Sequence, residues 1–124
     1  MNKEIVFVYG TLKEGCSNHY LLEHSSFINN AGLNGVMMVN LGHYPALLLK
    51  GNTLAQGEVY EVDEKTLRSL DRLEGHPIYY ERKKVELTTG QWAWVYFLNV
   101  PEGKSNKYPE ITSGIWLPNR KYER

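Results

Sequence analysis

Glu74, an acidic residue near the end of an expected helix, is the first candidate for chemistry in this chain. At about 100° per residue, Glu74 projects between Leu67 and Leu70, on the side to which Leu73 also belongs. A charged side chain seldom faces a core unless it is paired or used. Burial raises the pKa of a carboxylate, and one that titrates near neutrality can accept and return a proton. The residue type and its position therefore predict general acid/base chemistry.

Two structural interpretations of Glu74 remain open at this point. The side chain could turn outward where the helix ends, or it could pair with Arg82 or with a tyrosine hydroxyl. The residues that follow, Gly75-His76-Pro77, predict a sharp exit from the helix. Glu74 would then lie at the end of an element, where binding groups are common.

A glycine-marked loop follows the first expected strand and is the second candidate. Residues 4–9 read as a buried strand that stops at Gly10-Thr11-Leu12. A short helix is expected over residues 18–24, with Ser17 or Asn18 as its N-cap. A strand, a glycine loop and a helix in this order can direct backbone N–H groups at an anion or an oxyanion. The alternative is a purely structural turn.

The remaining elements must position these two candidates. A helix over residues 63–75 is favoured by Asp63 as N-cap and by Gly75 as the residue after its last turn. The other expected elements are strands, at residues 36–41, 46–49 and 54–62, and a hairpin of residues 81–88 and 91–98 around Thr89-Gly90.

The last strand is apolar on both faces, which is typical of a strand covered on both sides or wrapped into a small barrel. Gly57 could mark a β-bulge or a bend of such a barrel. The segment from residue 101 onward is rich in Gly, Ser, Asn and Pro, and Trp116 is expected to anchor it on the barrel surface. The fold class expected is α+β.

Length and composition exclude several classes of function. The 124 residues suit a single domain, residues 1–124. With 14 basic and 14 acidic residues, the chain has no net charge and no basic run, so nothing indicates nucleic-acid binding. We find no apolar run of membrane length and no signal-peptide pattern. The single cysteine, Cys16, is consistent with a reducing cytoplasm.

Three blocks of sequence resemble those of the gamma-glutamylcyclotransferase-like proteins. The first is Phe7-Val8-Tyr9-Gly10-Thr11-Leu12-Lys13-x-Gly15. The second combines Gly57-Glu58-Val59-Tyr60-Glu61-Val62 with Leu70-Asp71-x-x-Glu74-Gly75, and the third is Tyr80-x-Arg82. The blocks follow the family's order and spacing from about residue 5 to residue 98. The short chain and Tyr44-Pro45 look most similar to the gamma-glutamylamine cyclotransferase branch.

The resemblance implies a small mixed β-barrel with flanking short helices and a cavity at one end. It also implies conversion of a γ-glutamyl amine or γ-glutamyl amino acid to 5-oxoproline and a free amine, with Glu74 as acid/base and no metal or cofactor. The substrate-binding residues that it implies are Tyr9, Gly10, Thr11, Leu12 and Tyr80. A non-catalytic binding module or a protein-interaction barrel would be the alternatives. The amine half of the substrate and the oligomeric state are left open.

Other residues carry weaker signals. Cys16 and His19 are close in sequence, but they lack the third group of a nucleophilic triad, and the four histidines lack zinc-ligand spacing. Asp71 is expected to be solvated or to cap an element, and Arg82 to stabilise a strand end. Tyr44-Pro45 could form a pocket rim or a plain turn, and the turn is favoured.

Overall fold

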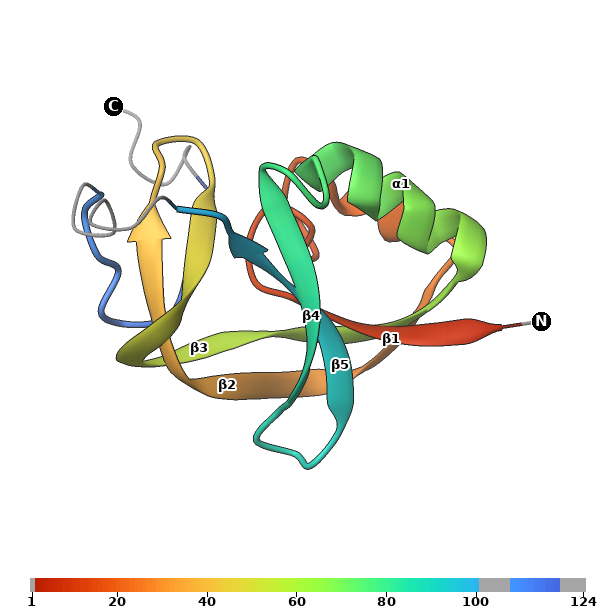
Figure 1. Ribbon diagram of the computed structural model, residues 1–124. Coiled ribbons are helices and arrows are strands. Elements are labelled where there is room, and N and C mark those ends of the chain that lie inside the picture. Colours follow the sequence, from red (N-terminus) through yellow and green to blue (C-terminus); the bar gives the residue numbers. More distant parts are fainter. Residues whose placement is uncertain (1, 101–107, 119–124) are drawn as a thin grey trace.

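The computed structural model describes residues 2–100 and 108–118, which build one mixed sheet of five strands (Figure 1). The strand order is β2-β3-β1-β5-β4, and β1 and β5 run parallel while the other neighbours are antiparallel. In sequence order the elements are β1 (Lys3–Val8), η1 (His19–Leu22, a 3-10 helix), β2 (Ser26–Asn40), β3 (Pro45–Asp63), α1 (Glu64–Glu74), β4 (Tyr80–Glu86) and β5 (Trp92–Leu98).

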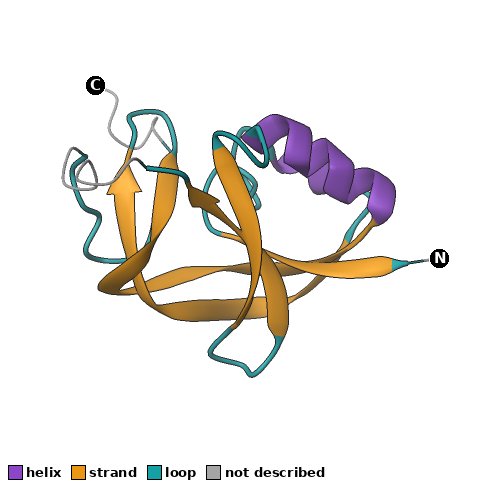
Figure 2. Cartoon of the chain, in the orientation of Figure 1, coloured by secondary structure: helices purple, strands orange, loops and turns teal. Residues whose placement is uncertain are grey.

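The sheet curls into a half-barrel, and α1 lies along one side of it (Figure 2). This confirms the expected α+β class, and the expected barrel is open on one side. Among the described residues the flanking helices are α1 and the short η1. None of these helices has the length and apolar character that crossing a membrane requires.

The two longest strands differ most from the sequence prediction. The expected strands 46–49 and 54–62 are parts of the single strand β3, and β2 begins ten residues earlier than the predicted start at Val36. Register shifts on both sides of Val36 allow the two strands to stay paired through this irregular stretch. Gly35 has φ 78°, and a Cβ on Gly51 would lie 2.5 Å from the carbonyl oxygen of Val36. Glycine at these two positions therefore permits continuous pairing.

Gly57 has a different role from the bulge considered for it. Its pairing with Ala31 lies within an unbroken register. A Cβ at this position would lie 2.4 Å from the carbonyl oxygen of Val8 and 2.7 Å from the ring of Phe7. Gly57 therefore lets β1 approach β3 closely just before the glycine loop begins.

Helix α1 has both predicted caps. The Thr66 N–H donates to the Asp63 side chain over 2.8 Å, and Gly75 adopts the left-handed conformation with φ 67°. Leu67 and Leu70 are buried as predicted, whereas Leu73 is 41% exposed. The apolar stripe therefore ends one turn early, and Leu73 lies at the opening of a pocket.

Both faces of β5 pack against apolar residues, as the sequence predicts. Tyr96 and Leu98 join the cluster that α1 covers, and Val95 and Phe97 join the cluster on the other face of the sheet. Trp116 is buried in that second cluster, which confirms it as an anchor. The part of the predicted tail at residues 101–107 and 119–124 lies outside the described residues.

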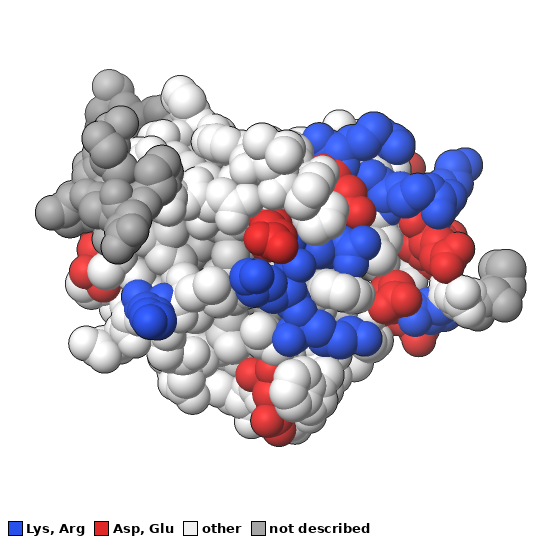
Figure 3. All heavy atoms as spheres, in the orientation of Figure 1, with Lys and Arg blue, Asp and Glu red and all other residues white. Residues whose placement is uncertain are grey.

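Basic side chains gather at the surface over α1 and β4 (Figure 3).

Candidate active site

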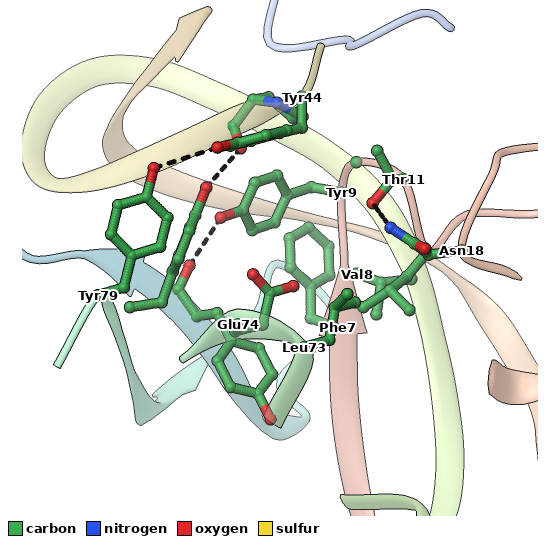
Figure 4. Close-up of a pocket in the computed structure, with 14 residues that line it drawn as sticks. Phe7, Val8, Tyr9, Thr11, Asn18, Tyr44, Leu73, Glu74 and Tyr79 are labelled. Atoms are coloured by element: carbon green, nitrogen blue, oxygen red, sulfur yellow. Dashed lines mark hydrogen bonds between the residues drawn. The ribbon is translucent and has the colours of Figure 1, made fainter. Parts of the chain in front are cut away.

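The last residue of α1, the end of β1 and the start of β3 enclose a pocket of about 200 Å³. All six predicted site residues line this pocket, although they come from three separate parts of the sequence (Figure 4). They are Glu74, Tyr9, Gly10, Thr11, Leu12 and Tyr80. The structure therefore brings together the two candidates that the sequence offered, the acid and the glycine loop.

Glu74 points into this pocket (Figure 4). It is only partly exposed, and its carboxylate makes no hydrogen bond or ion pair with any residue in the described ranges 2–100 and 108–118. Burial without a compensating partner raises the pKa of Glu74 from its ordinary 4.5 to about 7. Of the open interpretations, neither the outward turn nor the pairing with Arg82 is observed.

Arg82 instead pairs with Asp71, one helical turn before Glu74. Its Nε and Nη2 donate to the two carboxylate oxygens over 2.8 and 3.2 Å. The Tyr96 hydroxyl donates a third hydrogen bond to Asp71, over 2.6 Å. Burial opposes the charge on Asp71, but the hydrogen bonds from Arg82 and Tyr96 outweigh it and hold its pKa below the ordinary value. The expectation that Asp71 is solvated or capping is wrong, and the structural role expected for Arg82 is confirmed.

The segment that follows the Gly10-Thr11-Leu12 loop holds this loop in place through hydrogen bonds. The Asn18 backbone N–H donates to the Thr11 carbonyl, and the Asn18 side-chain amide donates to the Thr11 hydroxyl, both over 2.8 Å. His19 Nδ1 lies 2.9 Å from the Leu12 carbonyl oxygen. Asn18 occupies the predicted N-cap position of η1, but its side chain makes no capping hydrogen bond and holds the loop instead. The helix expected over residues 18–24 is correspondingly reduced to the one turn of η1.

The backbone N–H groups of Gly10, Thr11 and Leu12 donate no hydrogen bond to any described residue. Gly10 and Leu12 are buried, and all three residues line the pocket. Unpaired N–H groups that follow one another in a loop form an anion-binding concavity. Gly10 must be glycine here, since a Cβ would lie 2.7 Å from the Pro45 side chain.

The two predicted tyrosines shape the pocket through their rings. The Tyr9 hydroxyl donates to the Tyr96 carbonyl over 2.7 Å, and the Tyr80 hydroxyl donates to the Pro45 carbonyl over 3.0 Å. Burial raises the pKa of both phenols well above the ordinary value, and Glu74 adds to this effect. Both phenols are neutral, and their protons are already engaged with the backbone.

Sequence reasoning did not single out Asn18, Leu73, Tyr79 and Tyr96 as pocket residues, and for Tyr44-Pro45 it favoured a plain turn. The structure places Tyr44 and Pro45 in the lining, so the rim interpretation is correct. The Tyr44-Pro45 pair was a sequence signal for the pocket rim. Tyr79 gave no such signal, because it follows a loop whose sequence carries no periodic pattern.

The weaker cysteine and histidine candidates do not contribute to the pocket lining. Cys16 is not among the residues around the cavity, and the His19 ring packs near Tyr60, with 5.8 Å between the ring centroids. Within residues 2–100 and 108–118, no three or more His, Cys, Asp or Glu side chains gather into a group able to hold a metal ion.

Comparison with known proteins assigns the chain to a family. A family model described as "Gamma-glutamyl cyclotransferase, AIG2-like" matches residues 6–118. The chain belongs to this family. A "Putative gamma-glutamylcyclotransferase" of Methanocaldococcus jannaschii is 48% identical over 127 residues, which cover 97% of this chain and 96% of the relative. The gamma-glutamylcyclotransferase family protein YtfP of Escherichia coli K12 is 31% identical over 116 residues. The match covers 94% of this chain and 98% of YtfP.

Solved structures of this family share the fold. The crystal structure of a mouse AIG2-like protein matches with a TM-score of 0.79 and 30% identity over 94% of this chain and 90% of the other.

The gamma-L-glutamyl-butirosin B gamma-glutamyl cyclotransferase of Niallia circulans is 46% identical over 70 residues, 56% of this chain and 44% of that protein. The family assignment and the expected gamma-glutamylcyclotransferase-like fold are thus both confirmed.

Proposed function

We propose that this protein is a cyclotransferase that converts a γ-glutamyl amine or γ-glutamyl amino acid to 5-oxoproline and the free amine. The observation that carries the proposal is Glu74, a carboxyl group with no protein partner among the described residues, directed into a pocket that the Gly10-Thr11-Leu12 loop also lines. Membership of the gamma-glutamyl cyclotransferase family supports the same reaction. The proposed site needs no metal or cofactor.

The reaction is intramolecular, which fits a site with few catalytic groups. The α-amino nitrogen of the glutamyl group attacks its own δ-carbonyl carbon, a C–N bond closes the five-membered ring, and the original amide C–N bond breaks. Because nucleophile and electrophile belong to one molecule, holding the glutamyl chain in a folded conformation supplies much of the acceleration. The buried rings of Tyr9, Tyr80 and Phe7 enclose the space in which this folding would occur.

Glu74 would carry out both proton transfers. In its ionised form it accepts a proton from the substrate α-ammonium and thereby frees the nucleophile. In its neutral form it returns that proton to the leaving nitrogen as the tetrahedral intermediate collapses, which regenerates the carboxylate. The attacking nitrogen loses its second proton as the lactam forms, through the regenerated carboxylate to the released amine, so protons and charges balance. A pKa of about 7 suits both roles near neutral pH.

The unpaired N–H groups of Gly10, Thr11 and Leu12 would bind negative charge. They can hold the α-carboxylate of the glutamyl group or the oxyanion that forms at the δ-carbon. Hydrogen bonds from Asn18 to Thr11 hold the loop in place before the substrate arrives, so little reorganisation would be required. We further propose a cytoplasmic location, which the single cysteine supports.

The decisive experiment measures 5-oxoproline release from γ-glutamyl-ε-lysine, γ-glutamyl amino acids and glutathione. Wild type would be compared with Glu74→Gln and with Glu86→Gln, in which the same change is made at an exposed residue outside the pocket. We expect turnover of at least one compound by wild type and Glu86→Gln but not by Glu74→Gln. Activity that survives in Glu74→Gln would assign the acid elsewhere. Binding without any turnover would favour a non-catalytic binding module.

A further inference from the structure

The glycine loop, residues 10–12, belongs to a segment that begins and ends at one residue of β3, Glu58. Val8, the last residue of β1, pairs with Glu58 in the antiparallel register of the two strands. At the other end of the segment, the Glu14 backbone N–H donates to Oε1 of the Glu58 side chain over 3.0 Å. Residues 9–13 therefore form a closed loop whose two ends meet at Glu58.

The side chain of Glu58 is itself held by a buried tyrosine. The Tyr60 hydroxyl donates to the same carboxylate oxygen over 2.9 Å. Tyr60 is 4% exposed, and the rings of His19 and Phe27 lie 5.8 and 5.6 Å from its ring, centroid to centroid. Burial and the bond to Glu58 raise the pKa of this phenol above its ordinary value, so it is neutral and donates its proton. The carboxylate therefore has a fixed direction.

The middle of the loop is held through its carbonyl groups. The Gly10 carbonyl accepts from the Lys13 N–H over 3.0 Å, and the Thr11 carbonyl accepts from the Asn18 N–H over 2.8 Å. Because the C=O and N–H of one trans peptide point in opposite directions, these bonds also fix the directions of the Thr11 and Leu12 N–H groups. The far end of the loop is fixed by the carboxylate from β3.

This closure lies beside the pocket but outside it. Val8 lines the cavity, whereas its pairing partner Glu58 is not among the lining residues. Glu58 thus reaches a molecule in the pocket only through the loop that it closes.

We propose that Glu58, held by Tyr60, is a positioning residue for the proposed reaction. This inference rests on the proposed function and adds to it a residue that acts through the glycine loop. By binding the Glu14 N–H, Glu58 keeps the loop in its bound conformation before the substrate arrives. Negative charge that develops in the transition state then meets N–H donors that need no reorganisation.

Two substitutions of Glu58 test the proposal with the γ-glutamyl compound that wild type converts fastest. Glu58→Ala removes the acceptor, and because a small misplacement of binding groups is costly, kcat/KM should fall by about ten- to hundredfold. Glu58→Gln keeps a side-chain oxygen at the same distance from the backbone and should recover most of this loss. A wild-type kcat/KM in Glu58→Ala, or an equal loss in both variants, would overturn the proposal.

Glu61→Ala is the matched control. Glu61 lies on the same strand and is also partly buried, but its side chain makes no hydrogen bond or ion pair within residues 2–100 and 108–118. This variant should keep the wild-type kcat/KM. A loss equal to that of Glu58→Ala would assign the effect to a weakened β3 and would overturn the positioning role.

The order of the loop can be measured without any turnover. In ¹⁵N relaxation of the free protein, the amides of residues 10–12 should have order parameters of about 0.85 in wild type and in Glu61→Ala. In Glu58→Ala they should fall below about 0.6. Tyr60→Phe removes only the hydroxyl that holds Glu58 and should give a smaller decrease, which tests the proposal even if Glu58→Ala does not fold. Wild-type order parameters in whichever of these two variants folds would overturn it.

Failure of the proposed function can be told apart from failure of this inference. If wild type releases no 5-oxoproline from any compound of the panel, the proposed function fails and the relaxation data alone decide the role of Glu58. Loss of order in residues 10–12 of Glu58→Ala or Tyr60→Phe would retain Glu58 as the residue that holds the loop. A loop that stays ordered would overturn the inference as well.

Discussion

Arg82 forms its ion pair with Asp71, and Glu74, three residues further along α1, has no cation partner among the residues that the structure describes. Both partners of the pair have side chains that are 19% exposed. The pair fastens the last turn of α1 to β4, and Tyr96 adds a bond from β5. Asp71 is therefore ionised and Glu74 titrates near neutrality, although the two residues are neighbours on one helix. Two adjacent carboxyl groups thus acquire different roles from their environments.

Removal of the charge on Asp71 should destabilise the protein. Asp71→Asn weakens the bonds from Arg82 and Tyr96 and should lower the free energy of unfolding at pH 7 by about 1–3 kcal/mol. Since the pKa of Asp71 is lowered in the folded state, its contribution is present above the ordinary value of 3.8 and is lost as the pH falls below it. Urea unfolding at pH 7 and at pH 3 measures both effects.

Asp63→Asn is the matched control for this experiment. Asparagine caps a helix about as well as aspartate, so the variant should change the free energy of unfolding at pH 7 by only a few tenths of a kcal/mol. If the two variants lost the same stability, the Asp71 pair would contribute nothing beyond the loss of one surface charge.

Glu74 should make the folded protein less stable as the pH rises. Its pKa is about 7 in the folded state and 4.5 ordinarily, so folding favours the protonated form between these values. Its contribution to stability is complete below pH 4.5 and is lost as the pH rises through 7. Glu74→Gln should therefore match wild type at pH 4.5 and exceed it at pH 8, by up to about 3 kcal/mol. Identical unfolding curves at pH 8 would show that the carboxylate is well solvated.

The same group should set the pH dependence of activity. For the free enzyme, kcat/KM should fall tenfold per pH unit as the pH drops below about 7, because the neutral acid cannot accept the ammonium proton. Glu74→Gln should lose about 10²–10⁴ of the activity and the acidic limb of the profile. The measurement is initial-rate 5-oxoproline release from pH 5 to 9. A midpoint near 4.5 in wild type would mean that Glu74 is not the titrating base.

A side chain at Gly10 should destabilise the protein because it would contact the Pro45 ring. In Gly10→Ala the new Cβ would lie 2.7–2.8 Å from the Pro45 ring, and moving that ring should cost about 1–3 kcal/mol and disturb the loop. Pro45→Ala removes the ring that the new Cβ would contact. The double variant Gly10→Ala/Pro45→Ala should therefore lose less free energy of unfolding than the sum of the losses in the two single variants. Strictly additive effects in thermal unfolding would show that the contact is unimportant.

Local sequence patterns were sufficient for the elements whose signals are local. The caps at Asp63 and Gly75, together with the leucine spacing, predicted α1 to within a residue. Simple alternation predicted the two faces of β5, with Trp92 as an exception that is 57% exposed. The direction in which Glu74 projects followed from the same helical period, because a rigid helix fixes side-chain direction from spacing alone.

The tertiary structure decided everything that depends on distant partners. The Tyr96 hydroxyl meets Asp71, and the Tyr9 hydroxyl meets the Tyr96 carbonyl, only because the half-barrel brings separate segments together. The rim that Tyr44 and Tyr79 form joins two loops 35 residues apart, and neither loop has a periodic pattern. Spacing specifies where a side chain points from its own element. The partner that it meets there depends on strand register and on close approach at glycines, which are properties of the folded chain.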